Sequence, residues 1–85
     1  MAYNVNPVPI AKGVPVRLRV TFVVKGDPTS TPDLVNLASS IADALQRVWY
    51  EDDSQIVELQ CRKRKGRHPR AQIWVEALPQ IPEVD

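Results

Sequence analysis

The sequence predicts a small α+β domain in which one helix packs on a three-stranded sheet, in the order strand, helix, strand, strand. Residues 14–25, 55–62 and 71–77 alternate apolar and polar side chains, which is the period of a strand with one buried face. Residues 31–48 instead repeat their apolar side chains at helical spacing. The length of 85 residues suffices for one small core and excludes an enzyme with a cleft between two domains.

The first strand follows a segment that has no period. Prolines and a glycine break regular structure over residues 1–13, so we expect an extended arm there. We expect the folded domain over residues 14–78 and a loose tail over residues 79–85. In the first strand, the residues expected to face the core are Val16, Leu18, Val20, Phe22 and Val24.

The helix has a recognisable start. Thr31 suits the N-cap, Pro32 suits the first helical position, and Asp33 places a carboxylate in the first turn, where the helix dipole favours it. Val35 falls on the polar arc of this helix and is its one odd residue. The stripe expected to face the sheet comprises Leu34, Leu37, Ala38, Ile41, Ala44, Leu45 and Val48.

Two further strands flank a basic segment, and we expect them to pair with each other as a hairpin. If the first two strands are parallel neighbours, their crossover through the helix is right-handed. Because one helix cannot cover both faces of the sheet, we expect the other face or an edge to meet a second copy in a symmetric homodimer. The residues expected to face the core are Val57, Leu59 and Cys61 in the second strand and Ala71, Ile73, Val75 and Ala77 in the third.

Composition restricts the class of protein. Hydrophobic residues make up 44% and charged residues 25%, which is close to globular averages and excludes a disordered chain or a fibrous repeat. The longest apolar stretch, residues 20–24, is too short to cross a membrane, and no apolar segment follows Met1. We therefore expect a cytoplasmic protein without membrane contact. The single cysteine, Cys61, allows neither an internal disulfide nor a zinc cluster and is expected in the core.

Charge is segregated although the net charge is only +1. Six of the ten acids lie between Asp27 and Asp53, and a cluster of cations follows. This pattern suits either a solvated loop opposite a solvated helix or a surface for nucleic acid, or for metal and phosphate. Trp74 on the third strand fits a core residue or a platform for a base. The cations of the cluster are Arg62, Lys63, Arg64, Lys65, Arg67 and Arg70.

Carboxylates are the chemistry-bearing residues that remain. A serine triad is not supportable because the single histidine, His68, lies in the basic segment and is expected to be solvated or to touch phosphate. The three glycines are scattered, so no phosphate-binding loop exists. Asp33 lies at one end of the helix and the pair Asp52 and Asp53 at the other, and Mg²⁺ or Mn²⁺ takes such oxygen ligands. Alternatively, Asp33 supports the helix start and residues 51–53 form a solvated turn.

Two separated motifs resemble the RusA family of Holliday junction resolvases. The motifs are TPDLVNLASSIADAL and VWYEDDSQIVELQCRKRKG, where the family has Pro-Asp-x-Asp-Asn-Leu, a helix ending in Asp-Ala-Leu, and an acidic pair before Gln-Val/Ile-Val. The resemblance extends from about Val16 to Leu78. The matching positions are Pro32, Asp33, Asn36, Leu37, Asp43, Ala44, Leu45 and residues 51–57.

The resemblance implies a RusA-like fold and a small homodimeric, Mg²⁺-dependent endonuclease of the kind common in phages and prophages. Such an enzyme acts on four-way junctions during DNA recombination and repair. Asp33 and Asp53 would then be catalytic residues that hold the metal, with Asp52 as a third metal-site carboxylate. The cations of residues 62–70 would help to hold the junction.

Two departures from the family pattern affect the expected site. Val35 stands where the family has its second aspartate, and Ser39 stands where it has a lysine. A valine cannot bind a metal ion, so three functions stay open. The chain is a Mg²⁺-dependent resolvase, a relative that binds DNA without cleaving it, or a structural module whose basic segment contacts a protein.

Overall fold

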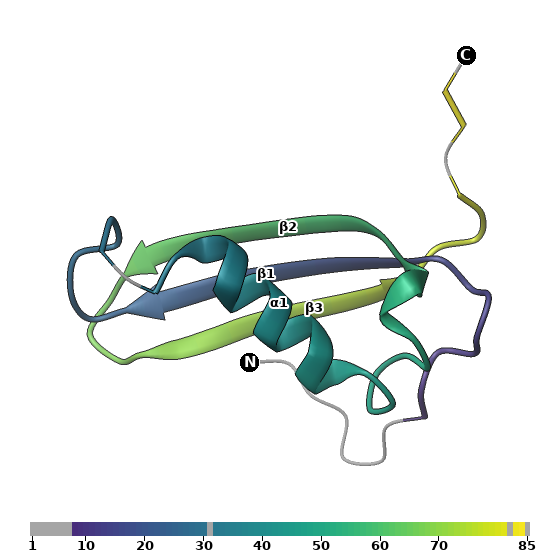
Figure 1. The fold of residues 1–85 in the computed structure, drawn as a ribbon, viewed down its shortest axis with the longest axis horizontal. Helices are drawn as coiled ribbons and strands as arrows, with labels where there is room; N and C mark the ends of the chain where they lie inside the picture. The colour runs from purple at the N-terminus through teal and green to yellow at the C-terminus, as the bar shows by residue number, and fades with distance from the viewer. Residues whose placement is uncertain (1–7, 31, 82, 85) are drawn as a thin grey trace.

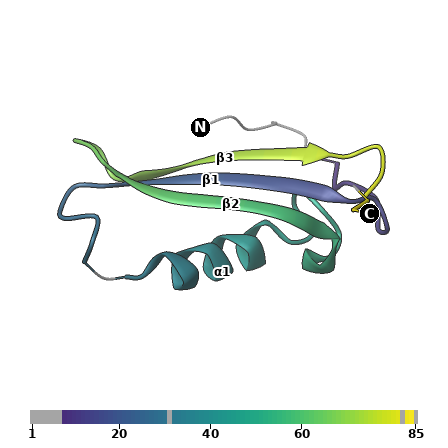
Figure 2. The ribbon, with the colours of Figure 1, turned by 90° about the horizontal axis from the view of Figure 1, so that it is seen from above.

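The computed structural model describes residues 8–30, 32–81 and 83–84. It contains a three-stranded sheet with a single α-helix on one face, as Figures 1 and 2 show from two directions. Both the class and the element order predicted from the sequence are confirmed. None of the helices in these ranges is long and apolar enough to cross a membrane. The elements are β1 (Val16–Val24), α1 (Leu34–Leu45), the 3-10 helix η1 (Asp53–Gln55), β2 (Ile56–Lys65) and β3 (Arg70–Ala77).

The strand order is β2-β1-β3, so the predicted hairpin between the second and third strands is wrong. β1 lies in the centre, parallel to β2 and antiparallel to β3. The physical reason is burial: β1 carries most of the fully buried side chains, whereas charged side chains such as those ending β2 are suited to sheet edges. Viewed from the helix side with the strands pointing upward, β2 lies to the right of β1, which is the expected right-handed crossover (Figure 1).

The core lies between the sheet and α1, where the predicted alternation in β1 holds from Val16 to Phe22. Val24, also predicted in the core, is only half-buried, and Thr21 and Val23 are buried although the pattern assigns them to the other face. Val16, Leu18 and Val20 are at most 2% exposed. Tyr50, which the sequence pattern marked only as the end of the helix, is fully buried, and its hydroxyl donates to the carbonyl of Ala42 at 2.5 Å. Burial raises the pKa of Tyr50 to about 12. From β3, three of the four predicted core residues pack here: Ala71, Ile73 and Val75.

β2 departs from its predicted alternation at its first residues, where it begins to pair with β1. Val16 pairs with Ile56 but Arg17 pairs with Glu58, so Val57 is the extra residue of a β-bulge. The bulge turns Ile56 into the core and leaves Val57 exposed, although the sequence pattern predicts the reverse. Leu59, also predicted in the core, is 50% exposed because it lies on an edge strand that α1 covers incompletely.

The helix is shorter than predicted at both ends. Asp33 is the N-cap and α1 begins at Leu34, so Pro32 and Asp33 lie before the first turn; Thr31, the predicted N-cap, lies outside the described residues. The helix ends at Leu45, and Arg47 adopts the left-handed conformation with φ 68°. Two residues of the predicted stripe are exposed: Val48, because it lies beyond the helix, and Ala44, which lies within the helix at the limit of the predicted apolar arc.

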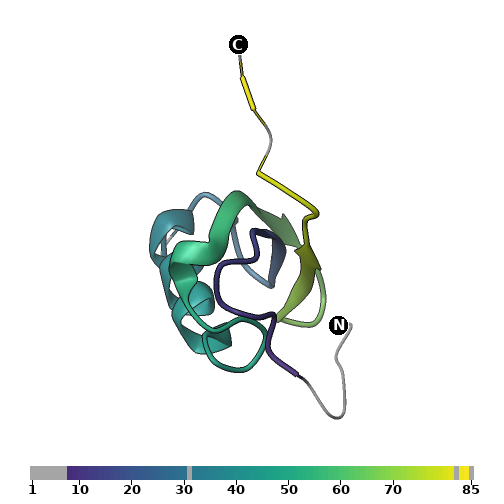
Figure 3. The ribbon, with the colours of Figure 1, turned by 90° about the vertical axis from the view of Figure 1, so that its right-hand side faces the viewer.

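The arm before β1 is attached to the turn after α1. The amide of Ile10 donates to the carbonyl of Trp49 at 2.9 Å, and the amide of Glu51 donates back to Ile10 at 3.3 Å. Figure 3 looks at this end of the molecule and shows the purple arm beside the teal turn. Residues 1–7 of the expected arm lie outside the described residues.

Candidate nucleic-acid interface

The cationic residues of the basic segment gather at the end of the sheet opposite the arm. Four of them belong to the last residues of β2 and one begins β3, so the loop itself is only residues 66–69. Because β1 separates β2 from β3, the cations flank the end of the central strand instead of occupying a hairpin tip. We call Arg62, Lys63, Arg64, Lys65, Arg67 and Arg70 the basic end.

Strand register divides the basic end between the two faces of the sheet. Arg62 and Arg64 pair with Thr21 and Val23, so they lie on the face without the helix. Arg70 pairs with Val23 from the other side and lies on that same face. Lys63 lies on the helix side, where its Nζ donates to the carbonyl of Ser30 at 2.7 Å. The basic end therefore presents charge in several directions around one end of the molecule.

Gly66 allows the chain to cross the end of β1. Its amide donates to the carbonyl of Val24 at 2.9 Å. A Cβ at this position would lie 2.4 Å from Cγ1 of Val23, far inside van der Waals contact. Any other residue would force the Val23 side chain to move, and the crossing sets Arg64 and Arg70 on opposite sides of Val23.

Asp33 is engaged at the N-terminus of α1. Its Oδ1 accepts from the backbone amide of Asn36 at 2.9 Å, and its Oδ2 lies 3.5 Å from Nδ2 of the same residue. The carboxylate lines a hollow that also contains Lys63 and residues 28–30. The expectation that Asp33 supports the helix start is confirmed in the form of an N-cap.

Asp52 and Asp53 lie at the opposite end of α1, in η1 and its cap. Oδ1 of Asp52 accepts from the amide of Ser54 at 3.0 Å, and this backbone hydrogen bond lowers the pKa of Asp52. The amide of Asp52 donates to Oε1 of Gln55 at 2.8 Å, which completes a capping box. Asp53 is exposed.

Gln55 is a residue whose role sequence reasoning missed. Its side chain is buried, and its Nε2 donates to the carbonyls of Ala11 and Val14 at 2.9 and 3.0 Å and of Ile10 at 3.3 Å. It therefore fastens the arm to the turn that contains Glu51, Asp52 and Asp53, which we call the acidic turn. The available signal was the spacing Asp-x-x-Gln, which is typical of a capping box.

A groove of about 430 Å³ between α1 and β2 brings together the two positions that depart from the family pattern and one predicted site residue. Val35, Ser39 and Asp53 line it, along with Leu59 and Cys61. Cys61 is half-buried here, and burial raises the pKa of its thiol. Asp33 does not line this groove.

The described residues do not assemble a Mg²⁺ site within one chain. No three carboxylate, histidine or cysteine side chains in residues 8–30, 32–81 and 83–84 lie close enough together to hold a metal ion. Asp33 and Asp53 line separate hollows, and an oxygen of Asp33 and one of Asp52 are already used in caps. The described part of one chain therefore supplies too few neighbouring ligands to hold the metal by itself.

Trp74 is not a core residue. Its side chain is 51% exposed on the helix-free face, where it pairs with Arg19 across β1 and β3. His68, as expected, is exposed in the short loop of the basic end.

Comparison with known proteins agrees with the two sequence motifs. The family model described as Endodeoxyribonuclease RusA matches residues 1–76. A protein of Lactococcus phage r1t, named "Crossover junction endodeoxyribonuclease rusA", is 38% identical over 73 residues, which cover 75% of this chain and 56% of that protein. "Uncharacterized protein YqaN" of Bacillus subtilis (strain 168) is 38% identical over 51 residues, which cover 60% of this chain and 36% of that protein.

The chain thus spans between about a third and just over half of the length of these relatives. No solved structure matches significantly. Because the family model covers most of the chain, the chain belongs to the RusA family of endodeoxyribonucleases.

Proposed function

We propose that the chain binds branched DNA, such as a four-way junction, through the basic end. The observation that supports this function most is the collection of six cations around one end of the sheet in a chain of the RusA family. Arginine and lysine side chains that neutralise phosphates release counterions, so this binding weakens steeply with salt. Charge presented in several directions suits a branched substrate better than a single straight duplex.

We further propose that the chain cleaves junctions poorly compared with how well it binds them. The groove that contains Asp53 has Val35 and Ser39 in place of the family's second aspartate and lysine. A metal site built from Asp33, Asp52 and Asp53 would need a ligand from a second chain or from residues other than those described here. Mg²⁺- or Mn²⁺-dependent cleavage is the second candidate function, and the observation that favours it is that Asp53 lies in the same groove as the positions where the family has its other site residues.

A homodimer through β2 and α1 is part of the proposal. The helix-free face is mainly polar and charged, whereas the β2 side exposes Val57, Leu59 and, from α1, Val35, which is 76% exposed. β2 is also an edge strand with unpaired backbone groups. Sedimentation at micromolar concentration should give twice the monomer mass, and Leu59→Lys should give a monomer while the matched Val48→Lys should not. A monomeric wild-type protein would exclude the dimer.

The decisive experiment measures binding and cleavage of one synthetic four-way junction. Binding is measured in EDTA, and cleavage is measured with Mg²⁺ or Mn²⁺. We expect tight binding with very slow cleavage, and we expect Val35→Asp combined with Ser39→Lys to raise cleavage. Asp33→Asn or Asp53→Asn in that background should abolish it.

Efficient cleavage by the natural chain, with no gain from Val35→Asp, would show that another acid has replaced the missing ligand. Absence of any junction binding would instead favour a basic end that contacts a protein.

A further inference from the structure

The face of the sheet that α1 leaves open has an ordered composition that follows from strand register. Alternate residues of β1 lie on this face, each flanked by one residue of β2 and one of β3. From the arm towards the basic end, the four rows are Glu58–Arg17–Glu76, Gln60–Arg19–Trp74, Arg62–Thr21–Gln72 and Arg64–Val23–Arg70.

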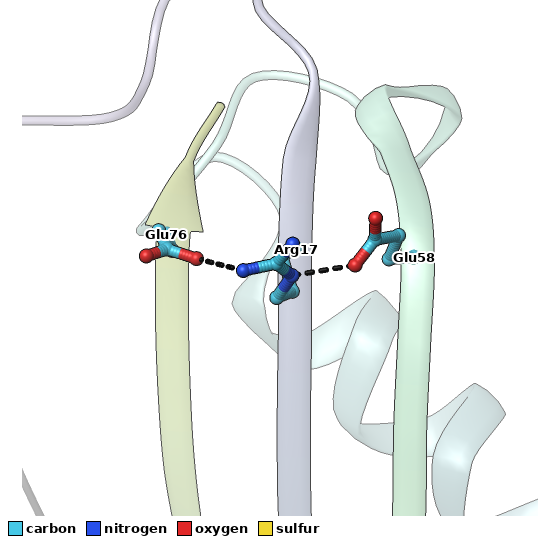
Figure 4. A network of polar contacts seen from close by, with 3 residues as sticks. All are labelled: Arg17, Glu58 and Glu76. Atoms are coloured by element: carbon cyan, nitrogen blue, oxygen red, sulfur yellow. Dashed lines mark hydrogen bonds and ion pairs between the residues drawn. The ribbon is translucent and has the colours of Figure 1, made fainter. Parts of the chain in front are cut away.

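The first row carries a net charge of −1, because its single arginine lies between two glutamates. Figure 4 shows Arg17 between the two glutamates, with its Nε 2.5 Å from Oε2 of Glu58 and its Nη1 2.7 Å from Oε1 of Glu76. The hydrogen bond from Arg17 lowers the pKa of Glu58, so this carboxylate stays ionised and paired at neutral pH. Arg17 therefore holds three strands together and has little charge left for a ligand.

The other three rows carry arginines and no acid. Arg19 forms no ion pair with any residue in the described ranges, although it lies only two positions from Arg17. Nε of Arg62 donates to Oγ1 of the buried Thr21 at 3.0 Å, which fixes the guanidinium over the sheet. With Arg64 and Arg70 in the last row, this positive surface continues into the basic end.

Trp74 lies in the first of these three rows, next to the row of Glu58, Arg17 and Glu76, and two small hollows adjoin it. One, of about 210 Å³, is lined by Trp74, Arg19, Thr21, Gln60 and Arg62, among others. The other, of about 250 Å³, shares Trp74 and Arg19 and is also lined by Arg17 and Glu76. Both are smaller than the roughly 300–1,000 Å³ of a typical small-molecule pocket, but they suit a single flat ring laid against the indole.

We propose that this face binds an unpaired, single-stranded segment of DNA. One base of the segment stacks on Trp74, and phosphates of the segment contact Arg19 and Arg62. The inference rests on the proposed function and names the part of the substrate that this second surface takes. A duplex presents only the edges of its bases to a protein, so an indole on a flat sheet can stack only on a base that has left the helix. Gln60 can donate to and accept from the edge of that base.

The size of the face limits the length of the bound segment. From the row of Arg19 to the row of Val23 is four residues, or roughly 13 Å at about 3.3 Å per residue. Even at the duplex rise of about 3.4 Å per nucleotide, which an extended unpaired strand exceeds, this length corresponds to at most about four nucleotides between Trp74 and the basic end. The face therefore suits the few unpaired bases at a branch point.

The test compares single-stranded with double-stranded DNA. Fluorescence anisotropy gives the Kd for a labelled oligothymidylate of about ten nucleotides and for a blunt duplex of the same length, at low salt. Trp74→Ala should weaken oligothymidylate binding by about 5- to 150-fold and leave duplex binding within about twofold. Trp74→Phe should retain part of the affinity because it keeps an aromatic ring. Val48→Ala, another exposed apolar residue, is the matched control and should change neither value.

Intrinsic fluorescence supplies a second readout, since the chain has two tryptophans and Trp49 packs against the core. Oligothymidylate should quench the wild-type emission, and Trp74→Phe should remove most of that quenching. If Trp74→Ala binds oligothymidylate as tightly as the wild type while the junction is still bound, the stacking surface is refuted and the proposed function stands. If the wild-type protein binds neither oligothymidylate nor the four-way junction, both proposals are refuted.

Discussion

The crossing at Gly66 yields a prediction that the structure makes quantitative. Gly66→Ala would place a Cβ 2.4 Å from Cγ1 of Val23, which is 7% exposed. Val23 is β-branched, so its Cγ1 cannot rotate away without leaving its favoured rotamer. Overpacking of this kind costs about 1–3 kcal/mol of unfolding free energy.

A double-mutant cycle isolates the contact. Val23→Ala alone removes two buried methyl groups and should cost about 1.5–2.5 kcal/mol. In the double variant the new methyl of residue 66 takes the space that Cγ1 vacated, so the combined cost should be at least about 1 kcal/mol below the sum of the single costs.

Urea unfolding measures all four proteins, and Gly26→Ala is the matched control. A Cβ at Gly26 would meet nothing within 4 Å, so that variant should stay within about 0.5 kcal/mol of the wild type or be slightly more stable. The reasoning is refuted if Gly66→Ala is as stable as Gly26→Ala, or if the two single costs add fully in the double variant.

Three further predictions concern the basic end and the acidic turn. Replacing Arg64, Lys65 and Arg67 by alanine should lower the slope of log affinity for junction DNA against log salt by about 2.7, at about 0.9 per lost phosphate contact; an unchanged slope would contradict DNA binding by these residues. Gln55→Ala should cost about 2–4 kcal/mol in urea unfolding, because the carbonyl of Val14 and the amide of Asp52 lose their partner and the carbonyls of Ile10 and Ala11 each lose one of two donors. The exposed Gln60→Ala should cost less than about 0.5 kcal/mol, and equal costs would contradict the role of Gln55 in fastening the arm. The pKa of Asp52 is lowered from 3.8 in the folded state, so the stabilising contribution of this carboxylate is present above that pH and is lost as pH falls through the folded pKa. Asp52→Asn should therefore lose less stability than the wild type on acidification below about pH 4, as followed by thermal melting.

The candidate site was only partly predictable from the sequence. Charge clustering placed the basic residues correctly at one end of the molecule, because they are consecutive in the chain. The sequence could not show that Lys63 lies on the helix side of the sheet while Arg62 and Arg64 lie on the open face. The face on which each residue of a strand lies is known only once its partner strand and register are known. Likewise, the exposure of Trp74 depends on α1 covering one face and not the other.

By itself, the sequence determined those features that depend on neighbours in the chain. Alternation identified the three strands, helical spacing identified α1, and two motifs identified the family. The tertiary structure alone decided that β1 separates β2 from β3, that Gln55 clamps the arm, and that Asp33 and Asp53 line different hollows. The physical reason is that every strand offers the same backbone donors and acceptors, so the choice of partner depends on which arrangement buries the most apolar surface.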